Sequence, residues 1–223
     1  TIELINSSIE LLNNNYLPII NNNLNYKLTT NYFSFTLDTP YNIPDIIKHT
    51  LKFGMKINNK LIGLITSRPL KIYLYDKCIP ILYVDYLCIE KKYRKQNLVQ
   101  NLILEMAYRG FKNEFKSFIF KKEIYPLPFS YIASYNTYIL DLSNIRYIGD
   151  SIWVKLTNSS SNSIIEKCYI FYILESTKFK LKQVYTIDEF KYYIISNNFI
   201  QSYYILNKKE EIDVLVVLFN NQY

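Results

Sequence analysis

The chain has 223 residues, a hydrophobic fraction of 49%, only 4 Gly and 7 Pro, and a formal net charge of +7. This composition excludes collagen-like chains and Pro/Gly-rich linkers, and it argues against disorder over most of the length. The charge predicts an anionic partner, such as a phosphorylated cofactor, anionic lipid or nucleic acid. Only four basic residues are Arg, which disfavours sequence-specific DNA recognition.

The single histidine and three cysteines limit the chemistry further. With His49 as the single histidine, the chain cannot assemble a metal site from several His and Cys ligands. A Ser-His-Asp triad would use the one histidine present. Cys78, Cys88 and Cys168 form no CxxC pair, so we expect buried, reduced thiols. No apolar run reaches the roughly 18 residues of a membrane-spanning helix, and the first residues lack a basic signal-peptide segment. We therefore expect a soluble, cytoplasmic protein without a bound metal.

Two short helices are predicted before the first strand. Ser7 and Glu10 have the spacing of a capping box, which predicts a helix over about 7–13. The Asn-rich stretches that follow favour an irregular connection. Pro44 suits the first turn of a second helix over 45–51.

Short β-branched and aromatic runs then predict an antiparallel meander. The last run is the longest and most apolar, as expected of a central strand. The turn between the second and third runs contains Arg68-Pro69. The four runs cover 53–57, 61–66, 71–76 and 79–89.

A basic loop over 90–97 follows the last of these runs. Apolar residues at helical spacing come next, beginning at Leu98, and a strand is predicted over 115–121. This order is that of a β-α-β unit, in which the loop brings a helix N-terminus beside the end of the central strand. Because the first N–H groups of a helix are unsatisfied, the loop predicts a pyrophosphate site. A solvated basic loop is the alternative.

The remaining sequence predicts further strands and one helix. Residues 158–163 are the clearest linker signal in the chain. A strand over 166–174, a helix over 187–196 and paired strands over 199–206 and 212–219 are predicted after it. We therefore expect a mixed α/β (α+β) fold with a largely antiparallel, twisted sheet and helices on both of its faces.

An ordered string of motifs resembles the N-terminal half of N-myristoyltransferases, a branch of the GNAT acyltransferase superfamily. The resemblance is strong over 53–104 and weaker toward the C-terminus. It implies a GNAT-like acyl-CoA-binding lobe over 1–150, with the start of a second lobe over 151–223 packed on the first. The motifs lie at 61–76, 84–94 and 102–103, in Tyr-Pro-Leu-Pro at 125–128, and at 186–194, 198–205 and 211–219.

The resemblance implies transfer of a long-chain acyl group from acyl-CoA, such as myristoyl-CoA, to the N-terminal glycine of a protein. Two backbone amides of a bulged strand, which match Tyr86 and Leu87, would form the oxyanion hole. The cofactor would lie along this strand and on the basic loop. The residues implied to contact it are Val84, Cys88, Ile89, Arg94, Lys95, Gln96, Asn97, Leu98 and Val99.

The sequence also departs from the family pattern. At 95–97 the family carries Ser, Lys and Arg where this chain has Lys, Gln and Asn. The family's base for the glycine amine is the C-terminal carboxylate of a longer chain. In its place Asp85, the terminal carboxylate of Tyr223 or no base at all remain as alternatives. Asp85 could equally satisfy loop N–H groups.

Three functions are therefore compared. The first is an N-myristoyltransferase-like acyltransferase, and the second is a catalytically impaired module that binds acyl-CoA or a lipidated peptide. The third, nucleic-acid binding through the basic loop, is disfavoured. A homodimer could supply the missing second lobe, and the composition, rich in Asn, Ile, Lys and Tyr, suggests a virus or parasite with an AT-rich genome.

Overall fold

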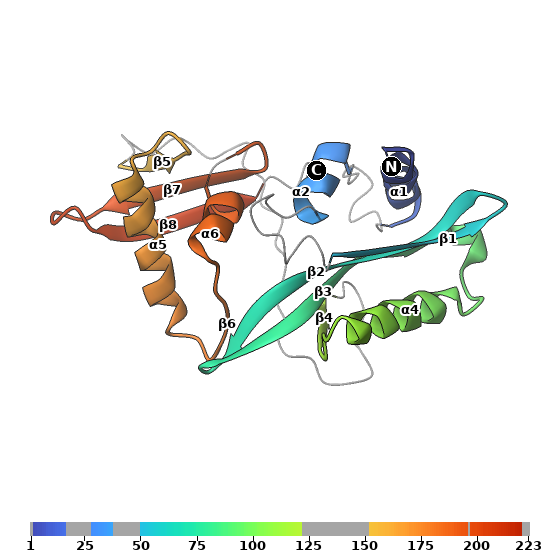
Figure 1. The fold of residues 1–223 in the computed structure, drawn as a ribbon. Coiled ribbons are helices and arrows are strands. Elements are labelled where there is room, and N and C mark those ends of the chain that lie inside the picture. The colour runs from blue at the N-terminus through green and yellow to red at the C-terminus, as the bar shows by residue number, and fades with distance from the viewer. Residues whose placement is uncertain (1, 17–27, 38–49, 122–151, 196, 220–223) are drawn as a thin grey trace.

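The computed structural model describes residues 2–16, 28–37, 50–121, 152–195 and 197–219, which form a mixed α/β fold of a five-stranded and a three-stranded sheet (Figure 1). This confirms the predicted class, with a largely antiparallel main sheet and flanking helices. Residues 45–49 of the predicted second helix and the predicted lobe boundary at 150 lie outside the described residues, so the division into two lobes stays a prediction.

The five-stranded sheet is built from the first half of the chain and one late strand. β1 (Leu51–Ile57), β2 (Lys60–Leu74) and β3 (Lys77–Ile89) are antiparallel neighbours. β4 (Phe118–Phe120) runs parallel to β3, which completes the predicted β-α-β unit with α4 (Leu98–Lys112) between them. β6 (Leu181–Gln183) pairs with the far end of β2.

β2 is one continuous strand where the sequence predicted two strands and a turn. Pro69, expected in that turn, is paired with Leu82 of β3. Pairing with β1 ends at Ser67, and pairing with β6 begins at Ile72. Among the described residues, Pro69 thus lies where β2 has a neighbour on one side only. A residue without an N–H is tolerated at such an edge.

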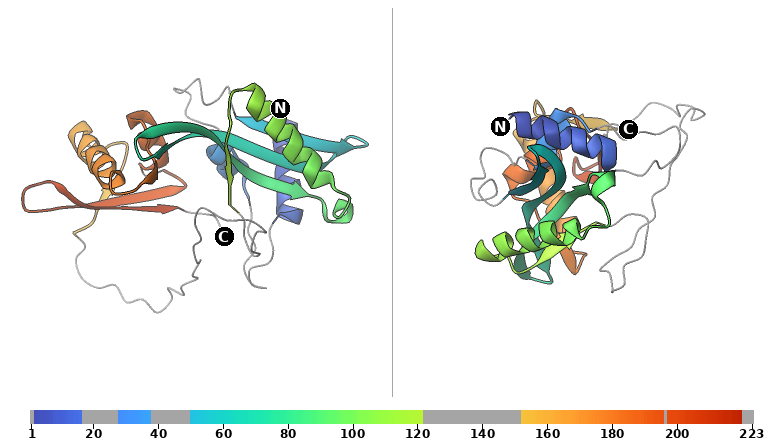
Figure 2. Two further views of the ribbon diagram at one scale, coloured as in Figure 1. Left: turned by 90° about the horizontal axis from the view of Figure 1, so that it is seen from below. Right: turned by 90° about the vertical axis from the view of Figure 1, so that its right-hand side faces the viewer.

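Helices cover both faces of this sheet (Figures 1 and 2). α1 (Ile2–Asn15) and α2 (Thr30–Leu37) lie on one face, and α4 lies on the other. Successive strand residues alternate between these two cores, as the pleat of a strand requires. The α1/α2 core contains Leu12, Phe33, Leu64 and Tyr86, whereas the α4 core contains Ile65, Ile89, Leu102 and Met106.

α1 begins earlier than predicted, and Ser7 is not its N-cap. The Ser7 hydroxyl donates to the Glu3 carbonyl at 2.9 Å, a bond that a serine inside a helix makes to the residue four positions earlier. Ser8 bonds in the same way to Leu4 at 2.8 Å. The capping-box spacing therefore marked a helix correctly but placed its start wrongly.

The C-terminal part contains α5 (Asn162–Ser176), where the sequence predicted a strand over 166–174. The buried Ile165 and Cys168 lie three positions apart, which is a helical spacing. Ser161, within the predicted linker, caps this helix by accepting a hydrogen bond from the Ile164 amide. The strand prediction was wrong because β-branched and aromatic residues dominated the local pattern.

The other C-terminal predictions agree better with the structure. α6 (Ile187–Tyr193) opens with the capping box of Thr186 and Glu189. β7 (Ile200–Leu206) and β8 (Ile212–Phe219) pair antiparallel, as predicted. β5 (Val154–Leu156), which was not predicted, adds a third strand beside β7.

All three cysteines are free, but only two fit the prediction of burial. Cys88 and Cys168 are buried, whereas Cys78 is exposed beside the β2–β3 turn. No helix in the described ranges is long and apolar enough to cross a membrane. Those ranges also contain no cluster of three or more His, Cys, Asp and Glu side chains that could hold a metal.

Candidate functional site

A cavity of about 520 Å³ lies where the end of α1, the end of β3 and the first turn of α4 meet. Eight of the twelve residues that the sequence assigned to the site line it, whereas Gln96 and the strand residues Val84, Asp85 and Tyr86 do not. The lining consists of Asn15, Tyr16, Leu87, Cys88, Ile89, Tyr93, Arg94, Lys95, Asn97, Leu98, Val99 and Gln100.

β3 bulges at the wall of this cavity. The register shifts between the pairs Leu64–Cys88 and Thr66–Asp85, so two residues of β3 lie opposite one residue of β2. Tyr86 has a φ of 49°, which a bulky side chain rarely adopts. A bulge re-aims the main chain, and this one falls at Tyr86 and Leu87.

The Tyr86 amide already has a hydrogen-bond acceptor. It donates to Oδ1 of Asp85 at 2.8 Å. The Tyr86 hydroxyl lies 3.0 Å from the hydroxyl of Thr36, and its ring packs beside those of Tyr16 and Phe33. The side chain is therefore held in the α1/α2 core, and burial raises the pKa of its hydroxyl well above the usual range.

Asp85 is a carboxylate enclosed beside the bulge. Burial raises the pKa of its carboxyl group, while the Tyr86 amide and the charges of Arg68 and Lys121 act in the opposite direction. The Tyr16 hydroxyl also donates to Oδ1, at 3.5 Å. Asp85 thus joins the end of α1 to the bulge without lining the cavity itself.

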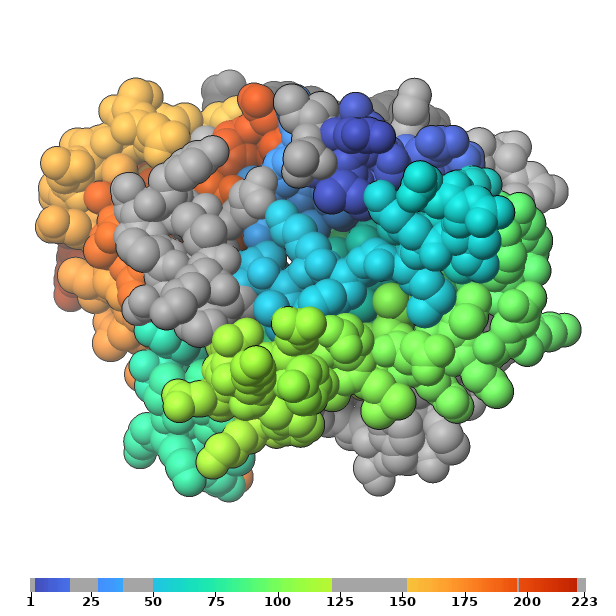
Figure 3. All heavy atoms as spheres, turned by 45° about the vertical axis from the view of Figure 1, so that its right-hand side comes forward, coloured from blue at the N-terminus to red at the C-terminus, as the bar shows by residue number. Residues whose placement is uncertain are grey.

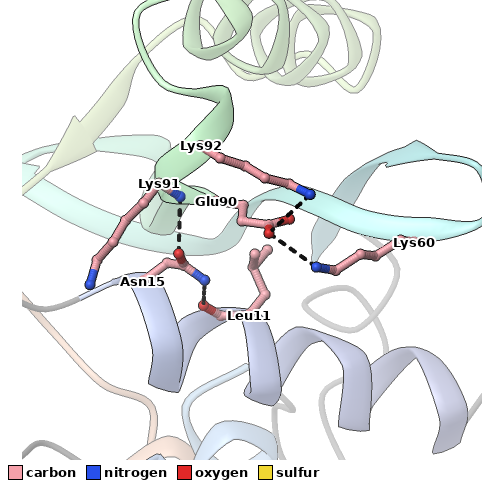
Figure 4. Close-up of polar contacts among 6 residues, drawn as sticks. All are labelled: Leu11, Asn15, Lys60, Glu90, Lys91 and Lys92. Atoms are coloured by element: carbon pink, nitrogen blue, oxygen red, sulfur yellow. Dashed lines mark hydrogen bonds and ion pairs between the residues drawn. The ribbon is translucent and has the colours of Figure 1, made fainter.

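The end of α1 is tied to the basic loop as well (Figure 4). The Asn15 side chain accepts a hydrogen bond from the Lys91 amide at 3.0 Å and donates to the Leu11 carbonyl at 2.9 Å. The Arg94 guanidinium donates to the main-chain carbonyl of Asn15 and, at 3.0 Å, to that of Ile89. These bonds fix the loop on the end of β3.

Glu90 neutralises part of the positive charge of the loop. Its carboxylate binds Lys60 at 3.0 Å and Lys92 at 3.8 Å, as Figure 4 shows. The ammonium of Lys92 also lies 4.8 Å from the centre of the Tyr93 ring. Of the loop cations, Arg94 and Lys95 line the cavity.

The first turn of α4 also lines the cavity. Asn97, the N-cap residue, has a left-handed conformation with φ 59° and ψ 13°, and its side chain makes no capping hydrogen bond. The leading N–H groups of a helix have no acceptors within the helix, and its N-terminus favours negative charge. With Arg94 and Lys95 beside it, this turn can hold a phosphate group.

The remaining wall can shelter an uncharged chain. Leu87, Cys88 and Ile89 connect the bulge to the loop, and burial raises the pKa of the Cys88 thiol to about 11. That thiol is neutral near pH 7. The cavity therefore suits an elongated ligand that has a phosphorylated end and an uncharged arm.

Sequence reasoning missed Asn15, Tyr16, Tyr93 and Gln100. Tyr93 and Gln100 adjoin residues that were named, so the loop and helix could have pointed to them. Asn15 and Tyr16 lie more than 70 positions away from the loop, and no local pattern connects α1 to it. Only the packing of α1 on the sheet brings them to the cavity.

Comparisons with known proteins agree on one family. A family model described as "Myristoyl-CoA:protein N-myristoyltransferase, N-terminal domain" matches residues 3–131. A protein of Amsacta moorei entomopoxvirus, assigned as a glycylpeptide N-tetradecanoyltransferase, is 27% identical over 198 residues, covering 86% of this chain and 59% of the viral protein. Glycylpeptide N-tetradecanoyltransferase 2 of Danio rerio is 28% identical over 109 residues, 48% of this chain and 21% of its own length.

Solved structures show the same fold. The crystal structure of Saccharomyces cerevisiae N-myristoyltransferase with bound myristoyl-CoA matches with a TM-score of 0.73 at 18% sequence identity. The match covers 98% of this chain and 58% of the yeast protein. This chain thus spans about three fifths of the length of the viral and yeast proteins.

Proposed function

The chain belongs to the myristoyl-CoA:protein N-myristoyltransferase family, and we propose that it binds a long-chain acyl-CoA in the cavity and transfers the acyl group to the N-terminal glycine amine of a protein. One observation carries the proposal. The cavity joins a basic helix N-terminus, suited to phosphate, to a strand bulge that contains the two amides expected to face the thioester.

The two ends of the cavity suit the two ends of the proposed ligand. The diphosphate of the coenzyme would lie on the first turn of α4, beside Arg94 and Lys95. The pantetheine arm would run along Leu87, Cys88 and Ile89 toward the bulge. The yeast structure with bound myristoyl-CoA supports acyl-CoA as the ligand class.

The bulge would serve the chemical step through its main chain. The glycine nitrogen forms a bond to the thioester carbonyl carbon, and the carbonyl oxygen becomes negatively charged. Collapse of this intermediate breaks the C–S bond, and the proton lost by the amine protonates the leaving thiolate. Well-placed donors such as the amides of Tyr86 and Leu87 typically contribute about 3–4 kcal/mol each to stabilising the oxyanion.

To stabilise the oxyanion, the Tyr86 amide has to give up its present hydrogen bond. It donates to Asp85 at 2.8 Å, so an incoming oxyanion has to displace a carboxylate that would also repel it. This contact favours a role for Asp85 in holding the bulge rather than a role as the base. It also supports a second candidate function, in which the protein binds acyl-CoA or a lipidated peptide without turnover.

One experiment separates these functions. The protein is mixed with myristoyl-CoA and a peptide that begins with glycine, and release of free CoA thiol is followed while calorimetry measures coenzyme binding alone. Turnover supports the transferase, and binding without turnover selects the binding module. If neither occurs at micromolar protein, but DNA retards the chain at low salt and not at high salt, nucleic-acid binding replaces both.

A homodimer is a further proposal, because cyclic dimers are by far the commonest symmetric oligomers. Light scattering with and without acyl-CoA tests it. A dimer that forms with the coenzyme supports it, whereas a monomer under both conditions removes it.

A further inference from the structure

The hairpin between β2 and β3 ends in an exposed apolar surface. We define the tip surface as Leu74, Tyr75, Phe179 and Leu181, whose exposed fractions are 43%, 61%, 63% and 38%. Leu74 pairs with Leu181 of β6, and the Tyr75 amide donates to the Lys180 carbonyl at 2.6 Å. Two segments that are distant in sequence are thus joined into one surface. The β2–β3 hairpin that carries part of it protrudes at the lower left of Figure 3.

Tyr75 adopts a conformation that its residue type disfavours. Leu74 and Lys77 are paired, so Tyr75 and Asp76 form a two-residue turn, and Tyr75 has a φ of 52°. A two-residue turn with a positive φ at its first position alone prefers Gly there. The Tyr75 ring is largely exposed, so core packing does not explain the strain. Strain of this kind in an exposed aromatic residue points to a role in binding.

Lysines dominate the charge around the tip surface. The two segments around it, 71–77 and 175–182, contain five lysines and two carboxylates, Asp76 and Glu175. Glu175 is paired with Lys178 at 2.6 Å, and the ammonium of Lys180 lies 5.8 Å from the centre of the Tyr75 ring. The combination is a small apolar surface with excess positive charge. The five lysines are Lys71, Lys77, Lys178, Lys180 and Lys182.

We propose that the tip surface docks on an anionic lipid bilayer, with its aromatic and aliphatic side chains in the headgroup region and the lysines beside anionic headgroups. Aromatic rings concentrate at membrane interfaces, and lysines near them are attracted to anionic lipid. Nucleic acid would account for the lysines but not for the four exposed apolar side chains. A second copy of the surface would bring like charges together.

The β2–β3 turn lies at one end of the sheet, and the end of β3 and the start of α4, which line the cavity, lie at the other (Figure 1). β3 runs ten residues from Lys77 at the tip to Leu87 at the cavity, which is roughly 30 Å at the usual rise of a strand. Docking would therefore leave the cavity clear of the bilayer. The proposal is independent of the acyl-transfer function, and the two can fail separately.

The test is sedimentation with phosphatidylcholine vesicles that contain phosphatidylserine at about a third of the lipid. We expect binding that weakens with salt and is at least tenfold weaker to vesicles of phosphatidylcholine alone. Lys77→Glu/Lys180→Glu should lower it about tenfold or more. The matched control is Lys208→Glu/Lys209→Glu in the exposed β7–β8 turn, which makes the same charge change. An equal loss in both variants, or no binding by the wild type, overturns the proposal.

Tyr75→Asn separates docking from folding. Asparagine tolerates a positive φ better than tyrosine does, so we expect an equal or higher melting temperature together with weaker vesicle binding. Thiol release with a soluble peptide should not change in this variant. A Tyr75→Asn protein that binds vesicles as well as the wild type contradicts the proposal, whatever the outcome of the turnover assay.

The exposed Cys78 provides a direct reporter, since the other two cysteines are buried. An environment-sensitive fluorophore on Cys78 should shift its emission to shorter wavelength on vesicles that contain phosphatidylserine. Vesicle binding without a shift would place the docking surface elsewhere. A tip-dependent dimer by light scattering, without vesicle binding, would assign the surface to a second copy and overturn the proposal.

Discussion

At the residue scale, the partners of each cation decide what it can bind. The basic loop carries four positive charges, on Lys91, Lys92, Arg94 and Lys95. In the structure the Glu90 carboxylate pairs with Lys92, and the Arg94 guanidinium donates hydrogen bonds to the main-chain carbonyls of Ile89 and Asn15. Lys95, which lines the cavity, is the cation whose removal tests ligand binding with least effect on the loop.

We expect Lys95→Ala to weaken binding of acyl-CoA about threefold to tenfold, roughly 0.7–1.4 kcal/mol. The physical reason is the loss of a partly solvated attraction to phosphate, so the effect should shrink as salt is raised. Lys92→Ala removes the same charge from the same loop but outside the cavity, and it should change affinity much less. Calorimetry compares the two variants, and equal effects would count against the proposed phosphate position.

Asp85→Asn tests whether the carboxylate is the base. Asparagine can still accept the Tyr86 N–H, so we expect the bulge and the turnover to be retained within a few-fold. Loss of the positioned base would instead lower the rate by about 10² to 10⁴. The rate of CoA release decides between these outcomes.

The same variant changes how stability depends on pH. Burial raises the pKa of Asp85 above its ordinary value of 3.8. The folded protein therefore binds this proton more tightly than the unfolded chain, and stability falls as pH rises from 3.8 through the raised value. We expect Asp85→Asn to flatten this part of the curve and to raise the melting temperature above it. An unchanged pH profile in thermal unfolding would contradict the burial of the charge.

At the scale of elements, caps define the helices α5 and α6, whereas composition misled the prediction for one of them. The apolar residues of 166–174 suggested a strand, but Ser161 caps a helix there and buries Ile165 and Cys168. The helix predicted over 187–196 is present as α6, and Thr186 and Glu189 form a capping box at its start. The difference is that a cap specifies helical backbone geometry directly, whereas β-branched and aromatic residues only indicate burial.

We expect Ser161→Ala to lower the free energy of unfolding by about 1 kcal/mol, because it removes the acceptor of the Ile164 amide. Ser163→Ala is the matched control, since that serine is exposed within the first turn of α5. It should be neutral or slightly stabilising, because alanine is the better helix former. Chemical denaturation of both variants makes the comparison, and equal destabilisation would argue against the cap.

At the scale of the whole molecule, aromatic contacts join the main sheet to the C-terminal helices. The guanidinium carbon of Arg68 in β2 lies 5.4 Å from the ring centre of Tyr83 and 5.5 Å from that of Tyr193 in α6. Phe35 of α2 stacks on Tyr192 at 5.4 Å between ring centres. Sequence pattern gave no sign of the contacts between Arg68 and Tyr193 or between Phe35 and Tyr192, because each joins segments far apart in the chain.

Arg68→Met should therefore destabilise the protein by about 1–2 kcal/mol, because methionine keeps the aliphatic packing but loses both cation–π contacts. Arg109→Met is the control, since Arg109 is exposed and its contacts, with the Glu105 carboxylate and the Tyr108 ring, stay within α4. Thermal unfolding measures the difference. Similar melting temperatures for the two variants would show that the Arg68 contacts add little between the two parts.

The sequence by itself determined the fold class, the β-α-β unit, the basic loop and the family, since these depend on periodicity, helix-end signals and motif order within short segments. Tertiary structure decided what those segments meet. It merged two predicted strands into β2, turned a predicted strand into α5, and brought Asn15 and Tyr16 to the cavity. It also bound the Tyr86 amide to Asp85. The packing of α1 on the sheet and the pairing of β2 with β6 join segments that are distant in the chain, so local pattern carries no record of these contacts.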